Sequence, residues 1–205
     1  MTPLKLIILD RDGTINEDRD DYVKSPDEWV PIPGALEAIA RLNHAGWHTV
    51  VATNQSGLAR GLFDISALNA IHARMNRELA EFGGRIDAVF FCPHGPDDGC
   101  TCRKPLPGLF TMIGERYGVS LRETYAVGDS LRDLQASATA GCAPHLVRTG
   151  KGAALDDAAV AGMVNAVPGT RWHADLAAFA QDLLLGERIE RGVAPESDSV
   201  SGKLR

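Results

Sequence analysis

Residues 4–14 read LKLIILDRDGT, and this stretch decides the fold class. Its first part, residues 4–9, is short, β-forming and almost entirely apolar, as expected for a strand that is buried on both faces of a parallel sheet. Two acids, Asp10 and Asp12, follow at its end. Similar apolar runs recur at residues 47–52, 88–91, 124–127 and 145–147. The sequence therefore predicts five short strands.

Helical patterns separate the predicted strands. The longest covers residues 67–82, where apolar side chains such as Ile71 and Met75 recur at helical spacing. Ser66 can cap its start. Further helices are predicted at residues 35–45, 108–117, 131–140 and 174–185. Strands that alternate with helices predict an α/β fold, with a Rossmann-like, doubly wound and mainly parallel sheet and helices on both faces.

The length and composition fit one globular domain. The chain has 205 residues, of which 44% are hydrophobic and 23% charged. We expect residues 1–185 to form a single domain, and residues 186–205, which hold few large apolar side chains, to form a flexible tail. No apolar run approaches the ~20 residues of a membrane-spanning helix, and no signal peptide opens the chain. We therefore expect a cytoplasmic protein. We also expect the chain to act as a monomer.

The charge of the chain restricts its partners. Its 21 basic and 27 acidic residues give a formal net charge of −6. Nucleic acids and anionic membrane surfaces are bound through an excess of positive charge, which this chain lacks. We therefore expect neither as a partner, although an acidic protein can still bind a small phosphorylated molecule locally.

Polar residues stand after or between the predicted strands. In an open parallel sheet, ligands bind outside the carboxyl ends of the strands, so chemistry is expected at these positions. The side chains found there are acids, hydroxyls, amides and a base: Asp10, Asp12, Thr53, Asn54, Gln55, Ser56, Lys104 and Asp129. A phosphoryl-transfer site needs such a set, namely a nucleophile, a proton donor and acceptor, metal ligands and fixed positive charge.

Several of these side chains have a defined role in such a site. Asp10 can attack phosphorus and form an aspartyl-phosphate, and Asp12 can protonate the leaving oxygen and then activate the hydrolytic water. Thr53 and Asn54 would donate hydrogen bonds to phosphoryl oxygens, and Lys104 would balance their developing charge. Each motif alone also has a plain interpretation, as a solvated acidic pair, a turn or a surface lysine. Their joint occurrence after buried strands favours the site.

The acids also suit a divalent metal. Mg²⁺ prefers a few carboxylates, carbonyls, waters and substrate oxygens in octahedral geometry. Asp10 and Asp129, with the main-chain carbonyl of Asp12, would supply the protein ligands. We expect Asp133 to orient Lys104 or a metal-bound water.

A second group of candidate ligands consists of Cys92, His94, Cys100 and Cys102, which stand within eleven residues. In an extended chain, residues i and i+2 point to the same side, so each pair can present two ligands to one ion. One histidine with three cysteines is the composition of a closed structural zinc site, with no position for a catalytic water. The alternatives are free cysteines, a disulfide between Cys100 and Cys102, and a plain loop histidine; a cytoplasmic chain favours zinc. The metal would brace the loop that leads into Lys104.

Four short motifs of the chain resemble those of the haloacid dehalogenase-like phosphatase superfamily. They are residues 10–14 (DRDGT), residues 53–55 (TNQ), Lys104 and residues 128–130 (GDS). The resemblance covers about residues 4–150. It implies a Rossmann-like fold, catalysis with Mg²⁺, and the nucleophile and acid-base roles for the two acids of the first motif.

The family often inserts a cap domain after the first or second motif. Here residues 13–33 leave no room for one, and the second motif runs into a single helix and a strand. We therefore expect an open active site without a cap domain. Its specificity must come from the loops at residues 15–28, 55–64 and 92–104, which suits a polar sugar phosphate.

The cysteine and histidine loop in front of Lys104 resembles one branch of the superfamily, which contains the heptose bisphosphate phosphatases and the histidinol-phosphate phosphatases. The resemblance implies that further residues contact the substrate: Arg11, Asp18, Tyr22, Gln55, Ser56 and Arg103. For Arg103, a contact with a second anionic group of the substrate and a solvated surface position both stay open.

This branch implies a magnesium-dependent phosphomonoesterase that removes the C7 phosphate of a heptose 1,7-bisphosphate, in the synthesis of nucleotide-activated heptose for lipopolysaccharide or a related glycan. A histidinol-phosphate phosphatase is the nearest alternative. A zinc-containing binding module without catalysis is the alternative from another class. The complete set of candidate catalytic residues argues against that module.

Overall fold

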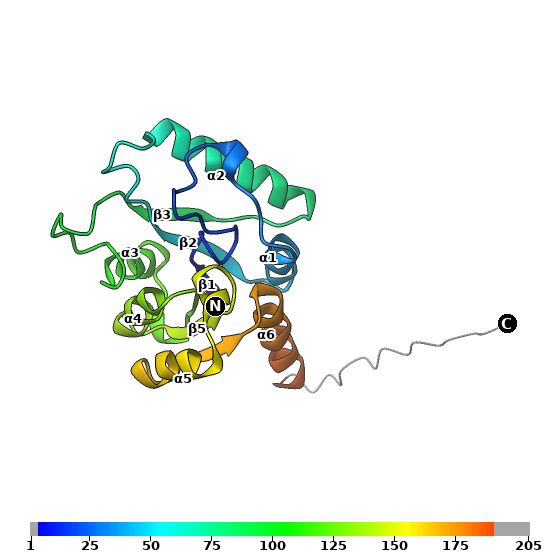
Figure 1. Ribbon diagram of the computed structural model, residues 1–205. Helices are drawn as coiled ribbons and strands as arrows, with labels where there is room; N and C mark the ends of the chain where they lie inside the picture. Colours follow the sequence, from blue (N-terminus) through cyan, green and yellow to red (C-terminus); the bar gives the residue numbers. More distant parts are fainter. Residues whose placement is uncertain (1–3, 191–205) are drawn as a thin grey trace.

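The computed structural model describes residues 4–190, which form one layered α/β structure (Figure 1). Its sheet has six strands: β1 (Leu6–Leu9), β2 (His48–Asn54), β3 (Ala88–Cys92), β4 (Tyr125–Gly128), β5 (Ala143–Val147) and β6 (Arg171–His173). All neighbouring strands are parallel, and their order is β3-β2-β1-β4-β5-β6. The predicted doubly wound parallel sheet is therefore confirmed.

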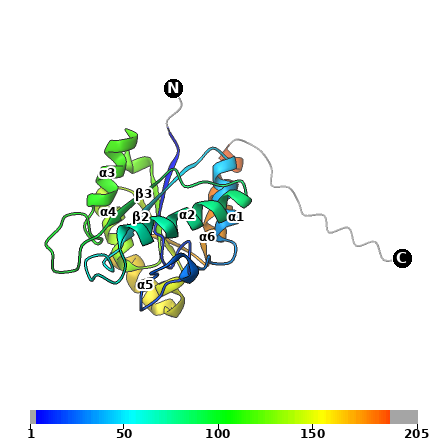
Figure 2. The same ribbon diagram turned by 90° about the horizontal axis from the view of Figure 1, so that it is seen from above.

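Helices cover both faces of the sheet (Figures 1 and 2). They are α1 (Ala35–His44), α2 (Ile65–Glu81), α3 (Gly108–Tyr117), α4 (Leu131–Ala140), α5 (Asp157–Ala166) and α6 (Leu176–Glu190), with short 3₁₀ helices η1 (Pro26–Glu28), η2 (Leu121–Glu123) and η3 (Gly150–Ala154). Helices α1, α2 and α6 pack on one face, and α3, α4 and α5 on the other.

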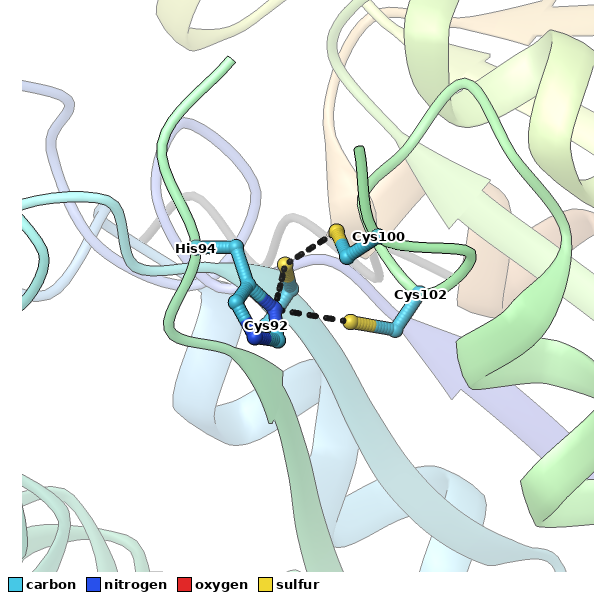
Figure 3. Close-up of side chains that lie close together, drawn as sticks. All are labelled: Cys92, His94, Cys100 and Cys102. Atoms are coloured by element: carbon cyan, nitrogen blue, oxygen red, sulfur yellow. Dashed lines mark hydrogen bonds between the residues drawn. The ribbon is translucent and has the colours of Figure 1, made fainter. Parts of the chain in front are cut away.

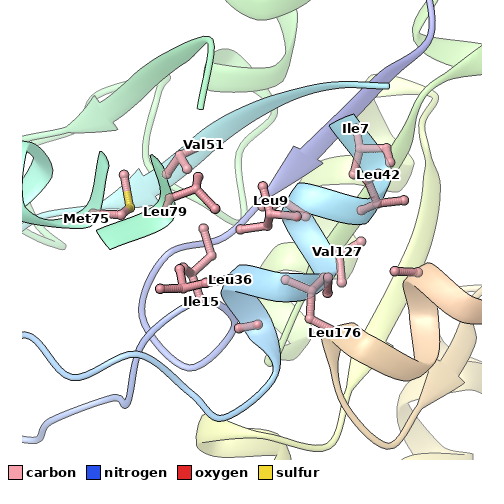
Figure 4. Packing of buried hydrophobic residues seen from close by; sticks show 14 of the residues in the cluster. Ile7, Leu9, Ile15, Leu36, Leu42, Val51, Met75, Leu79, Val127 and Leu176 are labelled. Carbon is pink, nitrogen blue, oxygen red and sulfur yellow. The ribbon is translucent and has the colours of Figure 1, made fainter. Parts of the chain in front are cut away.

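Strand β1 shows why a run of apolar residues becomes a central strand. Ile7 and Leu9 point to the face covered by α1 and α6, whereas Leu6 and Ile8 point to the face covered by α3. All four side chains are fully buried. Burying each one stabilises the fold by about 1.5–3 kcal/mol, before the entropy of ordering is counted. Figure 4 shows Ile7 beside Leu42 of α1, and Leu9 belongs to the same cluster as Leu36 of α1 and Leu176 of α6.

The strand order reverses between β1 and β4, and this places the ends of both strands beside each other. A parallel sheet opens a crevice at such a point, outside the carboxyl ends of its strands. The connections on either side are short. Within the described residues, only η1 lies between β1 and α1 and only α2 lies between β2 and β3, so the predicted absence of a cap domain is confirmed.

Some elements differ from the sequence-based expectation. Asp64 rather than Ser66 caps α2, since the Asp64 carboxylate accepts a hydrogen bond from the amide of Ala67 at 2.8 Å. Strand β6 and helix α5 were not predicted, because β6 is only three residues long and α5 has a weakly amphipathic, alanine-rich sequence.

The last described helix is longer than predicted. Helix α6 continues to Glu190, so residues 186–190 are helical and not part of a tail. Lys5, next to β1, forms an ion pair with Glu187 at 2.6 Å and ties these last turns to the sheet. Residues 191–205, the rest of the expected tail, lie outside the described part of the chain. No helix in residues 4–190 is long and apolar enough to cross a membrane.

Candidate active site

A cavity of about 240 Å³ lies at the carboxyl ends of the strands, where the strand order reverses. Its lining brings together most of the residues that the sequence predicts for the site: Asp10, Asp12, Asp18, Tyr22, Thr53, Asn54, Gln55, Ser56, Arg103, Lys104, Asp129 and Asp133. Arg11 is the predicted substrate contact that does not line it, because its side chain is fully buried and turned away.

Three acids form the centre of the site, and we call Asp10, Asp129 and Asp133 the carboxylate cluster. Each offers an oxygen within 4.8 Å of the others. Burial and the charge of Asp133 raise the pKa of Asp10 to about 7, and the same two causes raise the pKa of Asp129 to about 8. Three carboxylates that lie close together in a buried place can be ionised at the same time only if cations compensate their charge.

Lys104 supplies one such cation. Its Nζ lies 2.8 Å from Asp10 Oδ1 and 2.5 Å from Asp133 Oδ1, and it donates a hydrogen bond to the carbonyl of Ala52 at 2.8 Å. The residue is 3% exposed, and although burial opposes its charge, the two carboxylates raise its pKa. Asp133 also accepts hydrogen bonds from the amide and hydroxyl of Ser130 and so caps α4. Asp133 therefore holds Lys104 in place, which is one of the two roles that the sequence predicted for it.

The remaining oxygens of the cluster fit a divalent metal. Asp10 Oδ1 accepts from the amide of Arg11 and contacts Lys104, but within residues 4–190 no donor reaches Asp10 Oδ2. Asp129 Oδ2 accepts from the amide of Lys151 at 2.6 Å, and no described donor reaches its Oδ1. Asp10 and Asp129 both line the cavity, and each has an oxygen that no described donor reaches, so the pair offers a donor set that suits Mg²⁺.

Glycine at position 13 is required by the close approach of two loops. Gly13 has φ +82°, and a Cβ there would overlap the Asp129 carboxylate. Gly150, with φ +51°, begins η3 in the segment after β5 and packs against Gly13. Thr149 adds a hydrogen bond from its hydroxyl to the carbonyl of Gly13 at 2.6 Å. The loop after β5 therefore closes one side of the site.

Asp12 is held by several donors at once. The Arg11 guanidinium donates to both carboxylate oxygens of Asp12 at 2.9–3.0 Å. Asn16 and Gln55 each donate a further hydrogen bond at 2.9 Å. Burial alone would raise the pKa of Asp12, but Arg11 and these amides outweigh it and lower the pKa. Asp12 is therefore ionised at neutral pH.

The end of β2 presents one hydroxyl and two amides. Thr53 is almost fully buried beside Gln55, whose amide donates to the Thr53 hydroxyl at 2.9 Å. Asn54 exchanges two hydrogen bonds of 3.1 Å with the main chain of Lys104. The Asn54 side chain thus fixes the Lys104 segment, a contact that the sequence did not predict.

The outer part of the cavity is formed by loops. Asp18 pairs with Lys151, and Tyr22, at φ +68°, has the guanidinium of Arg60 over its ring at 5.9 Å. Arg103 donates to the carbonyl of His94 at 3.2 Å and lines the cavity. Polar and charged side chains therefore surround the entrance.

Three cations of the lining were not predicted: Arg19, Arg132 and Lys151. Lys151 has the clearest sequence signal, since it stands in η3, shortly after the end of β5, and ligands bind outside the carboxyl ends of parallel strands.

The cysteine and histidine side chains also converge, and Figure 3 shows them turned toward one another. Cys92 Sγ lies 3.7 Å from Cys100 Sγ, and Cys102 Sγ lies 3.3 Å from His94 Nδ1. All four ligand atoms lie within 4.8 Å of one another. Ligands about 2.3 Å from one tetrahedral zinc ion stand roughly 3.8 Å apart, so the donor set fits. All four cysteines of the chain are free, which excludes the alternative of a disulfide.

Comparisons with known proteins agree with this geometry. A family model described as a haloacid dehalogenase-like hydrolase matches residues 11–141. A D-glycero-beta-D-manno-heptose-1,7-bisphosphate 7-phosphatase of Bordetella bronchiseptica is 62% identical over 181 residues, 88% of this chain and 98% of that protein. A protein of the same name from Pseudomonas aeruginosa is 54% identical over 180 residues, 87% of this chain and 97% of that protein.

A solved structure is similar as well. The D,D-heptose 1,7-bisphosphate phosphatase of B. bronchiseptica, complexed with magnesium and phosphate, has a TM-score of 0.84 and 61% sequence identity, over 89% of this chain and 99% of that chain. The family model spans more than half of the chain, and the relatives match over nearly their whole length. The chain belongs to the haloacid dehalogenase-like hydrolase family.

Proposed function

We propose that this chain is a Mg²⁺-dependent phosphomonoesterase that removes the C7 phosphate of D-glycero-β-D-manno-heptose 1,7-bisphosphate. The observation that carries the proposal is the carboxylate cluster, held by Lys104, at an open polar cavity. The names of relatives that match over nearly their whole length support the choice of substrate. We place the reaction in the cytoplasm, in the synthesis of nucleotide-activated heptose, and assign it to a single domain.

In the first step, an Asp10 carboxylate oxygen attacks phosphorus. The bond from phosphorus to the C7 oxygen breaks, an aspartyl-phosphate forms, and Asp12 gives its proton to the departing oxygen. Lys104, in contact with Asp10, balances charge on the phosphoryl oxygens. The Thr53 hydroxyl, at the same cavity, donates a hydrogen bond to them.

In the second step, a water molecule attacks the phosphorus of the aspartyl-phosphate. Asp12 takes the proton of that water, the bond from Asp10 to phosphorus breaks, and inorganic phosphate leaves. The lowered pKa of Asp12 suits this step, because the group is then a carboxylate that can accept a proton. The arriving negative phosphate raises the pKa of Asp12, and this favours the protonated form that the first step needs.

Asp10 and Asp129 would hold Mg²⁺, with the main-chain carbonyl of Asp12 as the third protein ligand. Burial and the neighbouring acids raise the pKa of both carboxylates, and a bound divalent cation would offset this effect. The metal, when bound, neutralises phosphate oxygens and so lets two anions, the substrate and Asp10, approach each other.

We propose a structural Zn²⁺ at Cys92, His94, Cys100 and Cys102. With all four positions filled by protein, the ion has no place for a reacting water. The ligand Cys102 precedes Lys104 by two residues. The metal would therefore hold the segment from which Lys104 enters the site.

The loops around the cavity would recognise the sugar and its second phosphate. We propose that Asp18, Tyr22 and Ser56 contact sugar hydroxyls, and that Arg103 contacts the C1 phosphate. All four line the cavity. Arg11 and Asn54 would act differently, because the side chain of Arg11 is buried against Asp12 and that of Asn54 is bonded to the Lys104 main chain.

A substrate panel tests the proposal. With Mg²⁺ present, kcat/KM should be highest for the β anomer of the heptose bisphosphate, lower for the α anomer and lowest for histidinol phosphate. Phosphorus NMR should show that the C1 phosphate is retained. A preference for histidinol phosphate, or loss of the C1 phosphate, would overturn the assignment.

A further inference from the structure

One buried titratable side chain near the site has no role in the mechanism so far. His72 lies on α2, is 9% exposed and does not line the cavity. Its Nε2 lies 3.2 Å from the Arg11 NH1 nitrogen. Helix α2 follows β2 in the chain, so the contact joins a helix on one face of the sheet to the first motif after β1.

The guanidinium of Arg11 is fully enclosed, so its donors must be satisfied by protein groups. Its Nε and NH2 nitrogens donate to Asp12 at 2.9–3.0 Å. Within the described chain, His72 is the side-chain acceptor that reaches NH1. His72 thus completes the set of contacts that fixes the plane of the guanidinium.

The chemistry of the contact determines the state of the histidine. A guanidinium has only donors, so His72 Nε2 must carry a lone pair, and the ring proton must lie on Nδ1. Burial, and then the charge of Arg11, lower the pKa of His72 to about 4. At neutral pH, His72 is therefore an uncharged acceptor.

We propose that His72 is a positioning residue for the acid-base group Asp12, acting through Arg11. The inference rests on the proposed function, because it concerns the proton that Asp12 gives to the leaving oxygen. Three side chains act in series: His72 orients the guanidinium of Arg11, and this guanidinium orients both carboxylate oxygens of Asp12. Without the acceptor, a buried N–H would lose its partner and the fork would turn to find another.

Two variants of nearly equal shape isolate the acceptor. In His72→Gln, the side-chain carbonyl can accept from Arg11, whereas His72→Met fills a similar volume without a good acceptor. His44→Met, at an exposed site on α1, serves as the control. Thermal unfolding of all three shows whether they are folded.

The readout is kcat/KM on two phosphate esters, the heptose bisphosphate and an aryl phosphate with a good leaving group. This ratio covers the steps up to the departure of the leaving group. A sugar alkoxide needs a proton to leave, but a good aryl leaving group does not. A misplaced Asp12 should therefore impair the first reaction far more than the second.

For His72→Met, we expect kcat/KM to fall about 10- to 100-fold on the sugar phosphate, and less than about threefold on the aryl phosphate. His72→Gln should stay within about threefold of the wild type on both. Equal activity of the Met and Gln variants, or an equal loss on both esters, would overturn the inference. A wild type that hydrolyses no phosphate ester would instead overturn the proposed function.

A double-mutant cycle provides a second measurement should His72→Met fold poorly. Because His72 acts through Arg11, His72→Leu, which also lacks an acceptor, should lower kcat/KM on the sugar phosphate much less in an Arg11→Lys background than in the wild-type background. In addition, Arg11→Lys should show the same preference for the aryl ester. An Arg11→Lys variant that loses both activities equally would contradict the proposed series of contacts.

Discussion

Two clusters of potential metal ligands lie at the carboxyl ends of the same sheet, and they differ in what surrounds them. The carboxylate cluster follows β1 and β4 and lines the cavity. The cysteine-histidine cluster, Cys92, His94, Cys100 and Cys102, begins at the end of β3 and does not line it. The ligand atoms of the second cluster face one another (Figure 3).

The difference separates a reacting site from a bracing site. Asp10 and Asp129 each keep an oxygen that no described donor reaches, so a metal there can share its coordination with a substrate. In the other cluster, four protein ligands complete a tetrahedron. The two are connected through Lys104, which stands two residues after Cys102 and contacts Asp10 at 2.8 Å.

The largest effect should come from Asp10→Asn, which removes the nucleophile. We expect kcat to fall by more than about 10⁴-fold, while the zinc content and the unfolding temperature stay near those of the wild type. Asp27→Asn, at an exposed position in η1, is the control and should keep full activity. Phosphate release by Asp10→Asn at a rate near that of the wild type would mean that the carboxylate cluster is not the reacting one.

Lys104→Gln tests the link between the clusters. It removes the charge that contacts Asp10 and Asp133, so we expect kcat to fall about 10²- to 10³-fold with zinc retained. Lys5→Gln, at the opposite end of β1, should change the rate little. Should both lysine variants lose activity equally, the effect would reflect stability and not charge in the site.

Cys100→Ser should have a large effect on stability and a smaller one on rate, the opposite of what we expect for Asp10→Asn and Lys104→Gln. We expect the variant to lose its bound zinc. Its free energy of unfolding should fall by more than about 2 kcal/mol, which lowers the unfolding temperature by about 4–8 °C. The activity of the folded fraction should fall less than about tenfold, because the reacting groups remain.

Cys142→Ala is the control for this variant, since Cys142 is not one of the four candidate zinc ligands. It should keep about one zinc per chain by elemental analysis. Purified wild type that is stable and free of zinc would contradict the claim that zinc holds the loop in front of Lys104.

The buried histidine His145 belongs to neither cluster, and we expect it to affect stability alone. Burial, and then the charge of His173, lower the pKa of His145 to about 3. Between pH 6.5 and about 3 the unfolded chain binds the extra proton, so the stability that neutral His145 contributes is complete above pH 6.5 and is lost as the pH falls.

We therefore expect a loss on the order of 1 kcal/mol between pH 7 and 5.5, measured by denaturant unfolding. His145→Gln should reduce this dependence, and His44→Gln, at an exposed position, should leave it as in the wild type. An unchanged pH dependence in His145→Gln would show that another group is responsible.

The sequence predicted the site because buried strands and the residues that follow them leave a clear local signal. The apolar run before Asp10 is visible in a single window, and parallel pairing then brings the strand ends together. The same logic located Thr53 and Asp129, whereas Lys104, which stands between β3 and β4, was predicted as the cation that a phosphoryl-transfer site needs. Helices α3 and α4 were also predicted with the bounds that the structure shows.

Other features depend on contacts between distant segments, which a single sequence does not reveal. The contact of His72 with Arg11 spans 61 positions, and that of Lys151 with Asp129 spans 22. Arg11 was expected to contact the substrate because of its place in the motif. Its side chain instead turns inward to Asp12, since a buried carboxylate recruits the nearest guanidinium.

The central claim, that Asp10 carries the phosphoryl group, can be tested by trapping the intermediate. Enzyme mixed with excess heptose bisphosphate is quenched and treated with borohydride, which reduces an acyl phosphate to an alcohol. Mass spectrometry of the peptide that contains residues 4–14 should find homoserine at position 10, and none in Asp10→Asn. Rapid turnover with no reducible group at Asp10, or with the modification on another residue, would contradict the account.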